Sequence, residues 1–473
     1  MKKSAIIFGE KRMESDMEKT IAKEPIKLSD HFTYKRILRF VMPPIAMMIF
    51  TSIYSVVDGF FVSSFVGKTE FAALNLIMPL LIVLGAVGFM LGTGGTAIVA
   101  KTFGLGDAKR ANEYFSLIIY VNIVTGIVLA TAGILLARPV AILLGATSAM
   151  LEHCVLYARI ILVALPFFML QNTFQSFFVT AEKPKMGLLV TVLAGITNMV
   201  LDALFVGLLG WGLAGAAVAT ALAQFVGGAI PLFYFARKNS STLRLTKTKF
   251  YGKMLLKTCT NGSSELMSNI SMSVVTMLYN FQLMNLKGED GVAAYGAIMY
   301  IGFFCVSIFI GYAIGSAPVV GFNYGAGNKT ELRSLFRKSA VLMAVMGASM
   351  CVLSFIISSP FSLIFSSGSK DLYELTRRGF MIFALHYLIA GFNIFGSSFF
   401  TALNNGLISA IISFLRTIVF QCGTVLILPT LMGGVDGVWW SVVIAEALTF
   451  IVTLALIIAF SGKYGYAGRN NQQ

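Results

Sequence analysis

Charged residues are scarce in this sequence, and that scarcity limits the class of protein first. Asp, Glu, Lys and Arg make up 12% of the 473 residues, about half of their usual share of roughly 25% in soluble domains. Hydrophobic residues make up 57% of the chain. This balance excludes an ordinary soluble or disordered protein and predicts a membrane protein.

Cysteine and histidine are also rare, which excludes several kinds of chemistry. The five cysteines lie singly in apolar runs, with no CxxC motif and no paired histidine, so neither a disulfide framework nor a zinc site is expected. The segment GAGNKT at 325–330 is not a phosphate loop, because Lys329 does not follow a glycine as GxxxxGK[ST] requires. We therefore expect a protein that is not an enzyme and has no cofactor. His386 lies in the apolar run FALHYLI. Its side chain either hydrogen-bonds to a helix or lines a cavity.

Twelve apolar runs are long enough to cross about 30 Å of hydrocarbon as helices. They lie near 38–65, 70–99, 112–137, 154–180, 186–209, 212–236, 259–285, 292–322, 336–366, 379–403, 406–431 and 435–460. The sequence thus predicts an all-α polytopic membrane protein with twelve transmembrane helices.

The positions of the basic residues explain the net charge of +15. Most of the 36 Lys and Arg residues lie in the tails and in alternate loops, which the positive-inside rule assigns to the cytoplasm. Both termini are therefore predicted to be cytoplasmic, and a nucleic-acid partner is unnecessary. The opposite side carries seven, namely Lys68, Arg138, Arg159, Lys287, Lys370, Arg377 and Arg378, while Arg416 falls within a span.

The two sets of six spans resemble each other. AIVAKTFGLGD at 97–107 aligns with PVVGFNYGAGN 221 residues later, and VGKTEFAA at 66–73 aligns with KGEDGVAA at the same offset. QSFFVTA at 175–181 aligns with SSFFTAL 222 residues later, as GLAGAAVA at 212–219 does with GVDGVWWS. Four matches in one order indicate a duplication, with two pseudo-symmetric six-helix bundles around a central cavity.

This duplication predicts the domain organisation. We expect a cytoplasmic tail at 1–36, an N-lobe at 37–236, a basic connector at 237–257, a C-lobe at 258–460 and a second cytoplasmic tail at 461–473. One chain supplies both halves, so a monomer would suffice.

Acids inside the spans are functional candidates, because a charge at bilayer depth costs about 2.5–3.5 kcal/mol on insertion scales. Asn198 and Asp202 are i and i+4 on one predicted helix and project from one face. If Asp58 and Thr220 converge with them, the four enclose a polar pocket in the first half. Two buried carboxylates repel when ionised, so the pair can take up a proton, or its oxygens can hold Na⁺ instead. The alternative is a purely structural role, in which these residues only form hydrogen bonds between helices.

Other polar residues in the spans are less specific. Glu265 lies near the cytoplasmic end of its span. It either contacts a second cation or the substrate, or it is a solvated residue that caps the helix. Glu446 either has a role of its own or pairs with Arg416, one span earlier. Pro43 and Pro44 remove backbone donors and should bend the first helix, as a simple kink or as a hinge coupled to Asp58.

The order of several pieces resembles the multidrug and toxic compound extrusion (MATE) family, in the branch of the staphylococcal multidrug exporter and the DNA-damage-inducible transporters. The pieces are FVMPPIAMMIFTSIYSVVDGFFV at 40–62, GLGD at 104–107, ITNMVLDALFV at 196–206 and WGLAGAAVATALAQ at 211–224. The resemblance implies an ion-coupling network at Asp58, Asn198, Asp202 and Thr220, and a hinge at Pro43. A C-lobe cation site in some relatives matches Glu265, but the aspartate that accompanies it is missing, since 379–403 contains no acid.

The resemblance also implies function. We expect a secondary antiporter in the bacterial inner membrane that exports amphipathic, cationic organic compounds in exchange for H⁺ or Na⁺, and so contributes to antibiotic resistance. A cavity lined by Phe, Met and Tyr suits varied hydrophobic cations. The nearest alternative is a flippase for a lipid-linked saccharide, which would need a basic cavity to grip pyrophosphate. A channel or a membrane-embedded enzyme fits the sequence less well.

Overall fold

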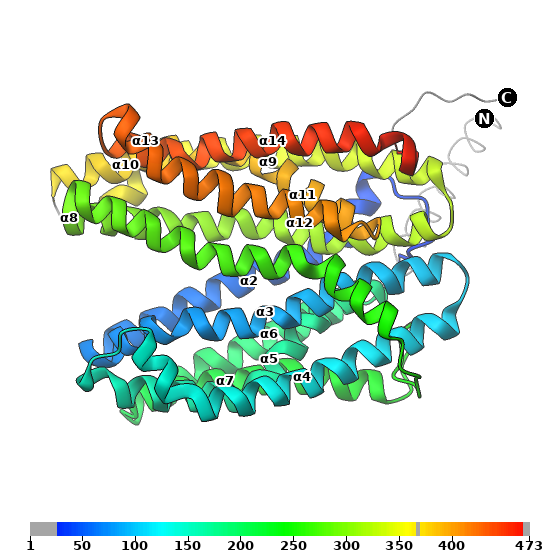
Figure 1. Ribbon diagram of the computed structural model, residues 1–473, viewed down its shortest axis with the longest axis horizontal. Helices are drawn as coiled ribbons and strands as arrows, with labels where there is room; N and C mark the ends of the chain where they lie inside the picture. Colours follow the sequence, from blue (N-terminus) through cyan, green and yellow to red (C-terminus); the bar gives the residue numbers. More distant parts are fainter. Residues whose placement is uncertain (1–25, 366–368, 467–473) are drawn as a thin grey trace, which may run out of the picture.

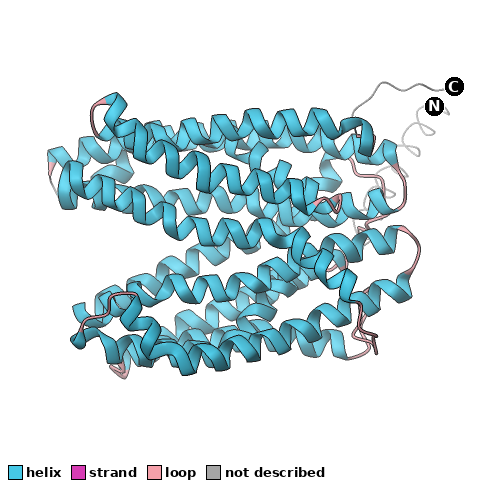
Figure 2. Cartoon of the chain, in the orientation of Figure 1, coloured by secondary structure: helices cyan, strands magenta, loops and turns pink. Residues whose placement is uncertain are grey.

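The chain folds into long helices joined by short loops. The computed structural model describes residues 26–365 and 369–466, and within them no strand occurs (Figure 2). The first half contains α2 (Tyr34–Phe65), α3 (Lys68–Gly104), α4 (Ala108–Leu143), α5 (Ser148–Thr180), α6 (Pro184–Asp202), η1 (Ala203–Leu208) and α7 (Gly212–Ala236). The second half contains α8 (Gly252–Gly325), α9 (Lys329–Phe365), α10 (Lys370–Ala384), α11 (Tyr387–Ala402), α12 (Gly406–Phe414), η2 (Leu415–Gln421), α13 (Cys422–Met432) and α14 (Val435–Tyr464).

These helices confirm the prediction of twelve spans. Ten are long and apolar enough to cross a membrane, and α10 with α11, bent by 47°, forms an eleventh. The twelfth lies within the 74 residues of α8, because Gly288 breaks its backbone with φ 61° and ψ −145°. Tyr279 and Tyr295, on either side of this break, stack with ring centroids 4.9 Å apart, so the two segments fold back on each other.

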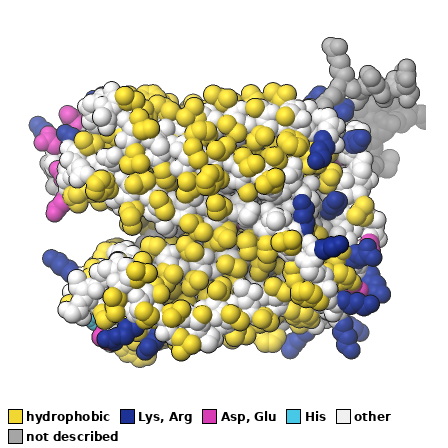
Figure 3. Space-filling view, in the orientation of Figure 1, with side chains coloured by type: hydrophobic (Ala, Val, Ile, Leu, Met, Phe, Trp, Pro, Cys, Tyr) yellow, Lys and Arg dark blue, Asp and Glu magenta, His cyan; other side chains and the backbone are white. Residues whose placement is uncertain are grey.

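The two halves form separate bundles that meet along α2, α3 and α8 (Figure 1). Figure 3 shows a notch between them that opens at the left end of the view, whereas most Lys and Arg side chains gather at the right end. The start of α2 and the end of α14 lie at that right, basic end. The molecule is therefore open at one end and closed at the other.

Contacts at the closed end carry the signature of the duplication. Gly104 approaches Phe322 so closely that an added Cβ would lie 2.1 Å from its carbonyl oxygen. Gly325 approaches the carbonyl oxygen of Lys101 to the same 2.1 Å. Because 104 pairs with 325 and 101 with 322 at the offset of 221, each contact is the pseudo-twofold copy of the other. Only glycine allows two backbones to meet this closely.

The N-terminal tail makes contacts that the sequence did not predict. Residues 1–25 and 467–473 lie outside the described residues, but part of the predicted tail is packed: Leu28 is 2% exposed and Phe32 1% exposed. The backbone N–H of Leu28 donates to Glu182 Oε1 (2.7 Å), and that of Phe32 donates to Glu331 Oε1 (2.9 Å). The sequence missed this segment because its many charged residues hide two anchoring apolar side chains. It ties the first half, through Glu182, to the second half, through Glu331.

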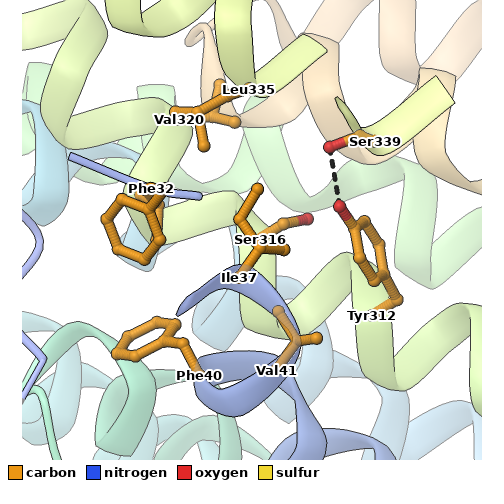
Figure 4. A pocket seen from close by; sticks show the side chains of 10 residues that line it. Phe32, Ile37, Phe40, Val41, Tyr312, Ser316, Val320, Leu335 and Ser339 are labelled. Atoms are coloured by element: carbon orange, nitrogen blue, oxygen red, sulfur yellow. Dashed lines mark hydrogen bonds between the residues drawn. The ribbon is translucent and has the colours of Figure 1, made fainter. Parts of the chain in front are cut away.

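The helix α2 belongs to the first half by sequence but contacts both halves. Its opening turns pack on the second half around a small cavity, where Ile37, Phe40 and Val41 face Tyr312, whose hydroxyl hydrogen-bonds Ser339 Oγ at 2.7 Å (Figure 4). Its later turns contact α6. A rotation of one half against the other must therefore bend α2 or break its contacts with one of the halves.

Candidate functional site

The four residues predicted to form a polar pocket lie on three neighbouring helices of the first half. Asp58 is on α2, Asn198 and Asp202 are on α6, and Thr220 is on α7. Asp202 is fully buried and Asn198 is 2% exposed, whereas Asp58 and Thr220 are half-buried. The π-helical segment η1 begins at Ala203, directly after Asp202. Such segments often occur at functional sites because they rotate side chains out of the regular helical register.

One hydrogen bond and the close approach of two acids bring the four side chains together. Asn198 Nδ2 donates to Thr220 Oγ1 at 3.4 Å. The carboxyl group of Asp58 lies close to the carboxyl group of Asp202 and to the side-chain amide of Asn198. The structure thus brings all four predicted residues into one cluster, hereafter the carboxylate pocket.

Several oxygens of the carboxylate pocket lack a donor. Asp58 Oδ1, both carboxylate oxygens of Asp202 and Asn198 Oδ1 are buried without a hydrogen-bond partner. Ionised carboxylates cannot donate to each other, so two facing acids need a proton between them or a cation beside them. Unpartnered oxygens are the ligands that a hard ion such as Na⁺ prefers. The pocket fits either ion, although the described residues hold no group of three or more His, Cys, Asp or Glu side chains suited to a metal.

Sequence reasoning missed three residues beside the carboxylate pocket. Tyr54, one turn before Asp58 on α2, lies near Gln171 of α5 and close enough to Asp58 for an electrostatic interaction. Tyr157 of α5, 2% exposed, also lies near Asp58 and Asp202. The spacing of Tyr54 from Asp58 is a signal that the sequence contained. Nothing in the apolar context of Gln171 and Tyr157 pointed to this pocket.

Pro43 and Pro44 lie where α2 meets the second half. Both are buried, and α2 continues unbroken through them from Tyr34 to Phe65. Gly311 of α8 approaches so closely that an added Cβ would lie 2.9 Å from the Pro44 carbonyl oxygen and 2.5 Å from Ile45 Cα. Because prolines leave carbonyls without a helical partner, they are the point at which α2 bends most readily.

A second charged cluster lies inside the second half. Arg416 of η2 pairs with Glu446 of α14, through Nη2 at 2.7 Å and Nε at 2.8 Å to the same oxygen, Oε1. This confirms the pairing considered from the sequence. Asn393 Nδ2 donates to the other oxygen of Glu446 at 2.7 Å, and Arg416 also acts electrostatically on Glu265 of α8. His386, between α10 and α11, contacts the Phe383 carbonyl oxygen through Nδ1 at 2.5 Å, as the helix-bonded reading predicted.

Comparisons with known proteins agree with this architecture. The model of the MatE family matches residues 43–204 and 266–424. Multidrug export protein MepA of Staphylococcus haemolyticus is 24% identical over 434 residues, which cover 90% of this chain and 93% of the relative. MepA of Staphylococcus aureus (strain MSSA476) is 20% identical over 427 residues, with the same coverage of both chains.

Solved structures are similar over nearly the whole chain. An outward-facing multidrug resistance MATE family transporter of the MOP superfamily superposes with a TM-score of 0.87 at 22% identity, covering 92% of this chain and 98% of that one. A MOP superfamily transporter from Pyrococcus furiosus, described as having a binding pocket of reverse polarity, gives a TM-score of 0.84 at 22% identity over 92% and 97%. At these identities the likeness establishes the fold.

Proposed function

This chain belongs to the MatE family, whose members are transporters and not enzymes, and from that premise we propose that it is a secondary active multidrug efflux antiporter. It exports amphipathic, cationic organic compounds in exchange for H⁺ or Na⁺ by alternating access. Relatives named as multidrug export proteins, matched over 90% of the chain, support the export of drugs.

The carboxylate pocket is the observation that carries the coupling. A buried pair of acids with unpartnered oxygens has a different free energy when empty and when it holds an ion. An ion changes the orientation of the halves only if it binds one arrangement more tightly than the other. The helix α2 provides that link, because it carries Asp58 at the pocket and packs its prolines against α8 of the other half.

The proposed ion site uses four side chains. Asp58 and Asp202 accept the proton or ligate Na⁺. Asn198 and Thr220 supply further oxygens and orient the two carboxyl groups. Pro43 is the proposed hinge in α2. Glu265 is a proposed second contact for a cation or for the positive end of a substrate, and Arg416 is the nearby charge that offsets it.

The proposed orientation places both termini in the cytoplasm of a bacterial cell, in the inner membrane. The closed end carries most of the Lys and Arg residues (Figure 3), which supports a cytoplasmic location by the positive-inside rule. The notch then opens to the outside, where a substrate leaves. Contacts between α2, α3 and α8 belong to a single chain, so we propose that the monomer is sufficient for transport.

Dye transport with two separate ion gradients tests this function. Purified protein in liposomes should move an ethidium-like dye when a pH gradient or a sodium gradient is imposed alone, and the effective gradient names the ion. A variant lacking both acids, Asp58→Asn with Asp202→Asn, is the matched control. Absence of dye movement under either gradient, together with translocation of a lipid-linked saccharide, would replace the proposal with a flippase.

A further inference from the structure

The duplication shows what the second half has in place of the carboxylate pocket. At the offsets of 221 and 222, Asp58 corresponds to Tyr279 and Asp202 to Thr424. The Tyr279 hydroxyl and Ser441 Oγ lie 2.6 Å apart, and Thr424 Oγ1 donates to the Ser441 carbonyl oxygen at 3.0 Å. Neutral hydrogen bonds therefore close this position, and it carries no acid.

The charge of the second half lies elsewhere and has no counterpart in the first. By the same alignment Arg416 corresponds to Ala194, Glu446 to Gln224 and Asn393 to Gln171. The first half thus has two amides and a small apolar residue where the second has an ion pair. The ion pair is not part of the repeated scaffold, which points to a role particular to the second half.

The contacts of Glu446 resemble those of a ligated anion. Its side chain is 5% exposed. Arg416 donates Nε–H to one oxygen and brings Nη2 within 2.7 Å of the same oxygen, while Asn393 donates to the other oxygen. Asn393 also donates to the Glu446 carbonyl oxygen at 2.9 Å, which fixes the amide in place. A carboxylate this deeply buried requires a counter-charge. A guanidinium supplies one that keeps its proton at any physiological pH.

We propose that Arg416 is a tethered counter-cation, which occupies the position where Glu446 would otherwise need a free cation. The inference rests on the proposed antiport, for which it has a specific consequence: Glu446 takes up no inorganic cation, because the guanidinium of Arg416 already neutralises it. Arg416 is then a specificity-determining residue for the coupling ion. Its side chain is 22% exposed, so a small cation can reach Glu446 from outside once the guanidinium is removed.

The test is a thermal unfolding measurement in detergent that requires no transport. Asp202→Asn provides the background, so that the carboxylate pocket adds no sodium response of its own. In this background Arg416→Ala leaves Glu446 without its cation, and sodium or methylguanidinium chloride, compared with choline chloride, should raise its Tm by about 2 °C or more. Arg416→Lys, which retains a tethered cation, should show no such difference.

A double variant separates a cation site from general destabilisation. Arg416→Ala with Glu446→Gln removes both charges, and its Tm should be the same in sodium, methylguanidinium and choline. A cation-independent Tm in Arg416→Ala, or an equal cation response in the double variant, overturns the proposal. If Arg416→Ala does not fold, the proposal requires that the double variant folds, because it has no unpaired buried charge. A double variant that is equally unfolded overturns the proposal. Failure of dye transport leaves these outcomes unaffected, so the two proposals fail separately.

Discussion

At the scale of the residue, buried charge is the feature that separates function from ordinary membrane packing. Asp202 is fully buried with both carboxylate oxygens unpartnered, whereas Glu446 is buried with both oxygens bonded. The first arrangement is incomplete without a proton or cation, and the second is complete. The proposed ion site of the first half and the ion pair of the second therefore differ in whether the carboxylate oxygens already have partners.

Replacing Asp202 by asparagine should abolish coupled transport while the protein stays folded. Asparagine keeps the size and hydrogen-bonding capacity of the side chain but removes the charge that an ion neutralises. We expect dye efflux under an imposed gradient to fall at least about tenfold, the size of effect expected when a charge-dependent step is lost. The control is Asp290→Asn at an exposed position next to the break in α8. Full activity of Asp202→Asn would remove this residue from the mechanism.

Glu182 gives a pH-dependent prediction outside the membrane-spanning helices. Burial raises the pKa of this carboxyl group, although the Leu28 N–H bond partly opposes the rise. The folded state therefore holds its proton to higher pH than the unfolded chain, whose value is about 4.3. The contribution of this group to the free energy of unfolding is thus greatest below that value and declines as pH rises through the folded pKa.

Glu182→Gln should remove this decline, because glutamine keeps the acceptor oxygen and cannot ionise. Thermal unfolding in detergent between about pH 4 and pH 7 measures the decline. The range starts near the unperturbed pKa of a glutamate side chain. Wild type and variant should have similar Tm at the acidic end, and wild type should lose relative stability as pH rises. Parallel Tm curves at all pH values would contradict the prediction.

At the scale of the element, glycine decides how closely the helices of the two halves approach. Gly94 of α3 would place an added Cβ 2.0 Å from the carbonyl oxygen of Thr258, and Gly262 of α8 would place one 1.9 Å from that of Met90. Together with Gly104 and Gly325, these residues line the contact of α3 with α8. The closed end is therefore a backbone-to-backbone contact that any side chain forces apart.

Alanine at Gly104 or Gly325 should open the closed end. The new methyl group would have to lie within 2.1 Å of a carbonyl oxygen, so α3 and α8 must separate. We expect greater labelling by a water-soluble maleimide of a cysteine placed at Lys101, measured in inside-out vesicles. Gly296→Ala is the control, because nothing lies within 4 Å of its added Cβ. Unchanged labelling would show that this contact does not hold the end closed.

At the scale of the whole molecule, the two halves share a fold and differ in charge. The first half holds two acids in its pocket, and the second holds Glu265 and Glu446 beside Arg416. The halves meet through α2, α3 and α8 at the closed end and separate at the notch (Figure 3). Alternating access requires that the closed contact opens while the notch closes.

A cross-link between the halves should stop transport. Ser52 Oγ of α2 and Ser307 Oγ of α8 lie 2.5 Å apart, which brings a cysteine pair at these positions close to disulfide geometry. Oxidation of Ser52→Cys with Ser307→Cys should abolish dye transport, and reduction should restore it. Each single variant controls for the five native cysteines. Full transport by a cross-linked protein would mean that these helices stay together throughout the cycle.

Much of this architecture could be predicted because it depends on local patterns. Apolar runs marked the spans, and the repeated glycines revealed the duplication. The i, i+4 spacing placed Asn198 and Asp202 on one face. The packing of residues 26–33 was not predicted, because Leu28 and Phe32 are anchored by distant residues, Glu182 and Glu331. The proximity of Tyr54 and Gln171 was missed for the same reason.

The sequence alone determined that the chain spans the membrane as two related sets of six helices, since hydrophobicity and repetition are read along the chain. Only the tertiary structure decided that Asp58 meets Asp202, that Arg416 neutralises Glu446, and that Gly104 and Gly325 join the halves. The physical reason is the distance along the chain over which each interaction acts. Insertion into lipid depends on each segment by itself, whereas neutralising a buried charge depends on which distant segment lies a few ångströms away.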